Sequence, residues 1–301
     1  MESSLLQEFS RRLPTEQKWV EAVRDGNVAR IRAMSASGEV DKAKRPLQLM
    51  LKAATQGSSV GMLEYVLGEG AQVDCNIDIV AVIPRRRQKR FFEILISYGW
   101  PAGPRGLANN LRLGVEVVQL LLDNGAQVDV PCLKEATRIG DVEVVDLLFN
   151  HIDPRAKVPS LHDYMKAMDD PAYWAAPEMC SQEPSVKRII DEAGLLHVAA
   201  LHQDLGMVKF MLEKGADLDL IPDHHQATTE GVNGCALHKV VSRTALGKKP
   251  SLEIVQFLLD AGANPDVQDE LGRTPFDINE AWGDGSREVI RNLLRARMRK
   301  P

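Results

Sequence analysis

Apolar positions along the chain recur in short blocks that have the spacing of one helical face. Four blocks share a pattern: an aliphatic residue, a variable one, two apolar residues and another aliphatic, then two variable residues and Gly-Ala. The four blocks begin at Leu63, Val118, Val208 and Val255. Their glycines are Gly70, Gly125, Gly215 and Gly262. An Asp follows each glycine four positions later, at Asp74, Asp129, Asp219 and Asp266.

Each block predicts a helix that packs one apolar stripe inward and ends at a glycine in the left-handed conformation. The Asp after it is typical of a turn. A second, shorter helix completes each unit and is clearest at residues 196–200 and 237–241. The glycines are 55, 90 and 47 residues apart, which we interpret as two units, three units, and one unit with an insertion. The fold class predicted is all-α, with about eight stacked helix–turn–helix units, projecting turns and irregular insertions.

Several local motifs resemble those of the ankyrin repeat family. They are Gly272-Arg-Thr-Pro-Phe276, the Leu-His pairs at His197 and His238, and the Gly-Ala endings with their closing Asp. Thr274 and Pro275 also fit a helix start, as a capping hydroxyl and a first-turn proline. The resemblance runs from about Gln17 to Leu294. It implies an ankyrin-repeat solenoid whose concave face is lined by turns, with the two histidines bonded within and between turns.

The pattern divides the chain into four segments. Residues 1–14 form an N-terminal segment, and residues 15–153 carry ankyrin-like repeats that are partly degenerate. Residues 154–189 are irregular or hold a degenerate repeat, possible at Leu161-His162, and contain a loop rich in proline with Tyr173 and Trp174. Residues 190–298 carry further repeats and a C-terminal capping unit.

Two insertions hold residues that invite a functional interpretation. Tyr173 and Trp174 are either an anchor for a partner or a cover for the seam between two half-arrays, and we favour the cover. Residues 220–234 lengthen a turn and contain His224, which we assign to a solvated loop because no further ligands stand at metal-site spacing. A third interruption covers residues 242–250. We expect no metal and no cofactor.

The net charge and the cysteines limit which cellular compartments and which classes of partner fit the sequence. The net charge of −5 disfavours nucleic acid, and four cysteines without a CxxC pair fit a reducing compartment. The N-terminus has no secretory pattern and the longest aliphatic run is five residues, so we expect no membrane association and an intracellular, cytoplasmic protein. The basic run 84–90 is a nuclear-import signal or, as we favour, a solvated turn. Arg287, Arg291 and Arg295 are expected to keep a terminal helix soluble.

No catalytic motif is recognisable, so we expect a non-catalytic module or scaffold that binds a protein partner on its concave face. The alternatives are a substrate-recognition subunit of a larger complex such as a ubiquitin ligase, and a small-molecule or enzymatic role in a concave pocket. The sequence does not identify the partner or the oligomeric state. The residues predicted to bind are Asp74, Asn76, Trp100, Asp129, Tyr173, Trp174, Asp219, His224 and Asp266. Trp100 has a second interpretation, in which its ring fills a gap in a degenerate unit.

Overall fold

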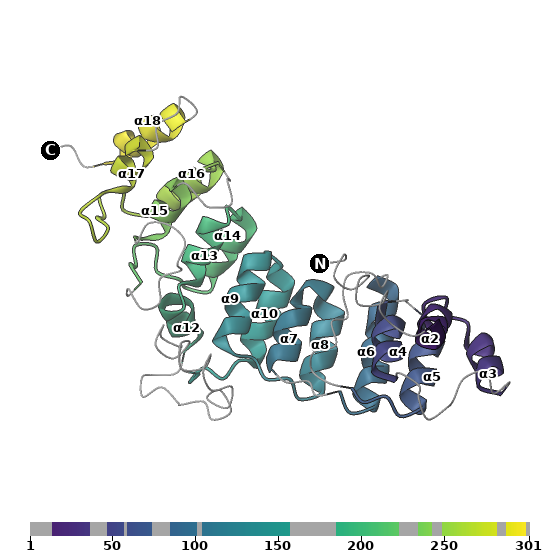
Figure 1. Ribbon diagram of the computed structural model, residues 1–301. Helices are drawn as coiled ribbons and strands as arrows, with labels where there is room; N and C mark the ends of the chain where they lie inside the picture. Colours follow the sequence, from purple (N-terminus) through teal and green to yellow (C-terminus); the bar gives the residue numbers. More distant parts are fainter. Residues whose placement is uncertain are drawn as a thin grey trace. The chain divides into compact units, whose positions relative to one another are not determined.

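A computed structural model describes most of the chain, and every element in the described part is helical (Figure 1). The described ranges are residues 14–36, 47–56, 59–73, 85–100, 104–156, 185–222, 234–242, 249–281 and 287–298. The helices belong to two compact units, residues 1–127 and 128–301. The irregular segment predicted at 154–189 therefore lies inside the second unit.

The first unit consists of packed helices whose cores are built from large apolar side chains. Helix α4 packs against α2 and α5, α5 against α3 and α6, and α8 against both α6 and α7. Trp19, Met50, Leu63 and Phe92 lie at the centre of these contacts and are at most 1% exposed. The helices are α2 Pro14–Arg24, α3 Val28–Ala36, α4 Leu47–Gln56, α5 Val60–Gly68, α6 Arg85–Ser97, α7 Pro104–Asn110, the 3-10 helix η2 Leu111–Leu113 and α8 Val115–Asp123.

The second unit contains two rows of helices. The first helix of each pair packs against the next in the order α9, α13, α15 and α17, and the second helices follow as α10, α14, α16 and α18 (Figure 1). The short helix α12 packs against α13. The helices are α9 Val130–Ile139, α10 Val142–His151, α12 Val186–Glu192, α13 Leu195–Leu201, α14 Leu205–Glu213, α15 Ala236–Val241, α16 Leu252–Asp260, α17 Pro275–Ala281 and α18 Glu288–Arg297.

The glycines predicted to stop helices do so. Gly125 has a φ of 89°, and its N–H donates to Leu122 O while the next N–H, that of Ala126, donates to Leu121 O. These bonds satisfy carbonyls that the helix end would otherwise leave unpaired. Gly70, Gly215 and Gly262 share the positive φ, at 97°, 91° and 102°. Local chemistry at the ends of α5, α8, α14 and α16 therefore follows the sequence pattern.

Two sequence-based interpretations need correction. The 90 residues between Gly125 and Gly215 do not hold three stacked units, because α9 packs directly against α13 and α10 against α14. Between these pairs the structure describes one further helix, α12, and residues 157–184 lie outside the described part of the chain. The basic run at 84–90 is not a turn, because α6 begins at Arg85 and continues to Ser97. The possible unit at Leu161-His162, and the first helix expected before α6, lie outside the described residues.

Candidate functional site

Two histidines brace the turns of the second unit. The Nε2 atom of His197, on α13, lies 2.9 Å from Leu220 O, and the Nε2 atom of His238, on α15, lies 2.9 Å from Arg273 O. Both carbonyls belong to the turn that precedes the next pair of helices. Since a carbonyl only accepts, each Nε2 carries the proton and each Nδ1 is left as an acceptor. The family resemblance predicts such bonds between turns, and they are present.

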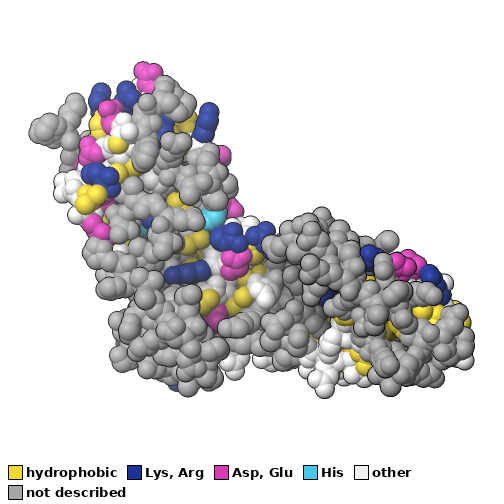
Figure 2. All heavy atoms as spheres, viewed as in Figure 1, with side chains coloured by type: hydrophobic (Ala, Val, Ile, Leu, Met, Phe, Trp, Pro, Cys, Tyr) yellow, Lys and Arg dark blue, Asp and Glu magenta, His cyan; other side chains and the backbone are white. Residues whose placement is uncertain are grey.

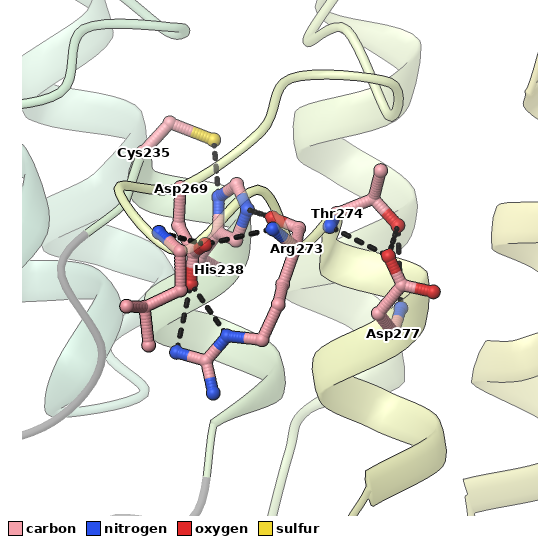
Figure 3. A network of polar contacts seen from close by, with 7 residues as sticks. Cys235, His238, Asp269, Arg273, Thr274 and Asp277 are labelled. Atoms are coloured by element: carbon pink, nitrogen blue, oxygen red, sulfur yellow. Dashed lines mark hydrogen bonds and ion pairs between the residues drawn. The ribbon is translucent and has the colours of Figure 1, made fainter.

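A cysteine thiol completes the bonding of His238 (Figure 3). Cys235 Sγ lies 3.1 Å from His238 Nδ1, and because that nitrogen is the acceptor the thiol is the donor. Burial raises the pKa of Cys235 to about 11 and lowers the pKa of His238. Both shifts favour the neutral thiol and the neutral ring. The pair is therefore not poised as the thiolate and imidazolium of a nucleophilic site.

His197 occupies the same place in its helix without this thiol. Gly194, with a φ of 64°, precedes it by three positions, as Cys235 precedes His238. Within the described part of the chain, His197 Nδ1 is buried and has no hydrogen-bond partner. Burial lowers the pKa of His197 to about 4, because the hydrogen bond to Leu220, which raises that pKa, offsets only part of the effect of burial. The His197 ring is therefore neutral and donates one hydrogen bond.

The turn between α16 and α17 is a hairpin whose backbone is fixed by Asp269. Its Oδ1 atom accepts the N–H groups of Leu271 at 2.9 Å and Arg273 at 2.8 Å, and its Oδ2 accepts Arg273 Nε at 2.9 Å. Asp269 N–H in turn donates to Arg273 O at 2.8 Å (Figure 3). Burial alone would raise the pKa of Asp269, but the bonds from Arg273 and Leu271 outweigh it and hold that pKa below its usual value.

The tip of this hairpin carries the most exposed large apolar side chain found in the described residues. Leu271 is 74% exposed, and Glu270 beside it is also exposed. An exposed leucine on its own is ordinary. Here, however, the backbone on both sides is held by hydrogen bonds, so the side chain is presented from a fixed position.

Neighbouring turns are joined to one another. Asp219 Oδ1 accepts the N–H of Asn264 at 2.9 Å, which links the turn after α14 to the turn after α16. The side chains of Asp217 and Asn264 each accept the N–H two residues on, at 3.0 Å. Asp191 on α12 accepts the N–H of Asp217 at 3.0 Å. The turns thus form one hydrogen-bonded row.

Helices α13 and α15 expose almost nothing. All residues of both helices are buried, including Val198 and Lys239, which directly follow the two histidines and are 5% and 2% exposed. Burial lowers the pKa of Lys239, with Glu270 opposing that shift. The exposed side chains of this unit therefore lie on its turns and on other helices, such as Leu252 on α16 and Val289 on α18.

Two of the predicted binding residues have structural roles within the fold. Asp129 is the N-cap of α9, where its side chain accepts Cys132 N–H at 2.8 Å. Trp100 is 4% exposed and its ring meets Phe92 edge-on with centroids 5.5 Å apart. Trp100 thus lies in the core, in line with the second of its two interpretations, and is not a turn-tip side chain.

Asp219 and Asp266 do lie in the turns, both half-buried. The other predicted residues lie outside the described part of the chain: Asp74, Asn76, Tyr173, Trp174 and His224. Leu271 was not predicted. Its signal was a bulky apolar residue between Glu270 and Gly272 in a predicted turn, where polar residues are usual.

The arginines of the terminal helix make contacts that the prediction did not include. Arg287 is buried and donates to Val241 O at 2.7 Å, while Arg291 pairs with Glu280 at 2.6 Å. Arg295 lies 5.1 Å from the ring centroid of Phe276. Arg287 and Arg291 thus attach α18 to the helices beneath it, whereas Arg295 is exposed, as a solubilising role requires. Figure 2 shows Lys and Arg next to Asp and Glu over the region that α17 and α18 occupy in Figure 1.

The described part of the chain lacks the features of a metal centre and of a membrane span. No group of three or more His, Cys, Asp or Glu side chains is arranged there to hold a metal ion. In that same part, the helices are all too short or too polar to cross a membrane.

Comparisons with known proteins identify the repeats. Residues 193–220 and 235–270 each match a family model described as ankyrin repeat. A stretch of 103 residues is 36% identical to the E3 ubiquitin-protein ligase Ufd4 of Drosophila melanogaster. This stretch makes up 33% of this chain and 3% of the ligase. The chain thus spans a small fraction of that relative. The region 193–270 thus carries ankyrin repeats, as the sequence motifs predict, and ankyrin repeats are protein-interaction modules.

Proposed function

We propose that this chain is a non-catalytic module that binds a protein partner through the turns of residues 185–298. The observation that carries the proposal is Leu271, 74% exposed at the tip of a hairpin that Asp269 and Arg273 hold in place. A large apolar side chain on a preformed tip can enter a partner's pocket with little loss of conformational entropy.

The contact is placed on the turns because the first helices offer little surface. Val198 and Lys239 are buried, so α13 and α15 contribute no exposed side chain to a concave face. Of the predicted binding residues, Asp266 lies in the turn that carries Leu271, and Asp219 lies in the neighbouring turn, which is bonded to it through Asn264. We propose that they support the contact and that Leu271 anchors it.

The proposal that the chain is not an enzyme is supported by the state of the cysteine–histidine pair in the described residues. Cys235 and His238 are hydrogen-bonded, but both are fully buried and both are held neutral. A reactive thiol needs access and a lowered pKa. The thiol of Cys235, which is hydrogen-bonded to His238 and not part of a disulfide, also supports an intracellular, cytoplasmic location.

The test is affinity capture with the full chain and two single variants, quantified by mass spectrometry. Leu271→Ser removes the exposed side chain, and Val289→Ser removes a matched one, 59% exposed on α18. Both substitutions are at the surface and should change stability by no more than about 0.5 kcal/mol. A protein retained by the wild type and by Val289→Ser, but lost by Leu271→Ser, is the expected result. If no protein depends on Leu271, the partner site at the turns is wrong.

A second candidate is a recognition role in ubiquitin ligation. The similarity to the Drosophila ligase favours it, although that similarity covers only 3% of the ligase. In the same capture experiment, ubiquitin-ligase subunits that remain bound to Leu271→Ser would support this role, because they would use a surface other than the tip. If no protein is captured at all, a small-molecule ligand becomes the hypothesis to screen.

A further inference from the structure

Gln203 has a backbone conformation that the fold elsewhere gives to glycine. Its φ is 56°, and no other non-glycine residue in the described part of the chain has a positive φ. It lies at the junction of α13 and α14. The same junctions of α2–α3 and α9–α10 hold Gly26, with a φ of 69°, and Gly140, with a φ of 86°. A side chain makes this conformation strained, so its retention indicates a compensating interaction.

The compensation comes from the two ends of the glutamine amide. Nε2 donates to Val240 O at 2.9 Å, and Oε1 accepts the N–H of Ser251 at 2.8 Å. Val240 is in the last turn of α15, and Ser251 is the N-cap of α16. One side chain therefore holds both ends of the segment 242–250, the third interruption of the repeat pattern.

This attachment lies at the opposite end of α14 from the bond between turns. Gln203 precedes α14, whereas Asp219, which accepts from Asn264, lies in the turn that follows it. A helix of nine residues separates the two attachments by about 13 Å. The repeats at 193–220 and 235–270 are thus joined at both ends.

We propose that Gln203 is a positioning residue, a strut that fixes the helix pair α15–α16 on the pair α13–α14. It closes the ends of the insertion 242–250, so that an interruption within one repeat does not loosen its stacking on the next. The strut explains why a glutamine stands in a left-handed junction. It is independent of any partner at the turns.

The test is amide hydrogen exchange by NMR on the full chain, with two variants. Gln203→Gly relaxes the backbone and removes both bonds, and Gln203→Asn tolerates the left-handed conformation but is too short to reach. The Ser251 amide should exchange about tenfold faster in both variants, as expected for one lost hydrogen bond. The Asn264 amide, held by Asp219 at the other end of α14, should keep its exchange rate.

Gly140→Gln is the matched control, because it places a glutamine in the corresponding junction of α9 and α10. A side chain there would meet the Asp204 carboxylate, and the glutamine backbone would have to adopt a φ of 86°. The melting temperature of Gly140→Gln should therefore fall. The proposal is overturned if Ser251 exchanges at the wild-type rate in Gln203→Gly or in Gln203→Asn. Faster exchange of Ser251 and Asn264 alike would also overturn it, since that pattern means general destabilisation.

Discussion

At the scale of single residues, the second unit depends on a few buried polar side chains that each join two segments. His197 and His238 connect a helix to a turn 23 and 35 residues further along the chain. Because each ring donates from Nε2 and is shielded from water, the neutral state is part of the folded structure. Protonation should therefore oppose folding.

Stability should fall in acid because of these two rings. Burial lowers the folded pKa of His197 to about 4 and lowers that of His238, against about 6.5 when unfolded. Their contribution is complete above pH 6.5 and is lost as the pH falls from 6.5 towards 4. For His197 the loss is about 1.4 kcal/mol per pH unit, or about 3 kcal/mol in all. Urea unfolding measured at intervals from pH 7 to pH 4 would give the slope.

His197→Gln keeps a donor for Leu220 O and cannot titrate. The slope of the unfolding free energy against pH in acid should therefore correspond to about one proton fewer. His151→Gln, at an exposed position of α10, is the matched control for the effect of introducing a glutamine. An acid slope that is the same in His197→Gln and in the wild type would contradict the assignment.

Cys235 should be replaceable by a hydroxyl but not by a methyl group. Cys235→Ser keeps a donor near His238 Nδ1, whereas Cys235→Ala leaves that nitrogen buried without one. The alanine variant should lose about 1–3 kcal/mol of unfolding free energy, and the serine variant less. Thermal or urea unfolding compares them. Equal losses in the two variants would mean that the thiol acts by packing alone.

At the scale of elements, the turns determine how the helices end and how neighbouring repeats meet. Each glycine predicted to stop a helix does so with a positive φ. Its replacement should therefore carry a conformational penalty even where there is space for a side chain. Gly125 illustrates this, because a side chain there would meet nothing within 4 Å. Any effect of substitution is then due to the backbone.

Gly125→Ala should destabilise the chain by about 1–2 kcal/mol, because alanine must adopt the φ of 89° at the end of α8. Gly61→Ala is the matched opposite. Gly61 lies exposed inside α5, also with nothing within 4 Å, and alanine there should stabilise by about 0.5–1 kcal/mol. Differential scanning calorimetry of the two variants should show melting temperatures shifted in opposite directions. Shifts of the same sign would refute the left-handed role of Gly125.

What the sequence could predict is what local chemistry determines. The glycine stops and the cap at Thr274 follow from spacing and residue type, and the histidine bonds follow from the family resemblance. Asp129 was predicted in a turn, and its role as the cap of α9 was not predicted. The direct packing of α9 on α13 could not be predicted, because it depends on contacts across an insertion. Nor could the fit of Trp100 into the core, since its position after Gly99 suits a turn tip as well as a packing site.

The candidate site shows the same division. Asp219 and Asp266 were predicted in turns and lie there, yet the half-buried Asp219 accepts a hydrogen bond from Asn264 and so links two turns. Leu271 was missed because one apolar residue among polar neighbours has no periodicity to reveal it. Only its exposure and the bonds around Asp269 distinguish it.

At the scale of the whole molecule, the chain should unfold in more than one step. Stacked repeats contact mainly their neighbours, so stability is close to a sum of local terms, and the described helices belong to two compact units divided at residue 127. Leu196→Ala empties a core position of α13, and Leu63→Ala an equally buried one of α5. Each should cost about 2–5 kcal/mol within its own unit. Hydrogen exchange read by mass spectrometry should therefore show lost protection in residues 128–301 for the first variant and in residues 1–127 for the second. Loss of protection throughout the chain in both variants would mean instead that the two units unfold as one, and that the division at residue 127 has no energetic counterpart.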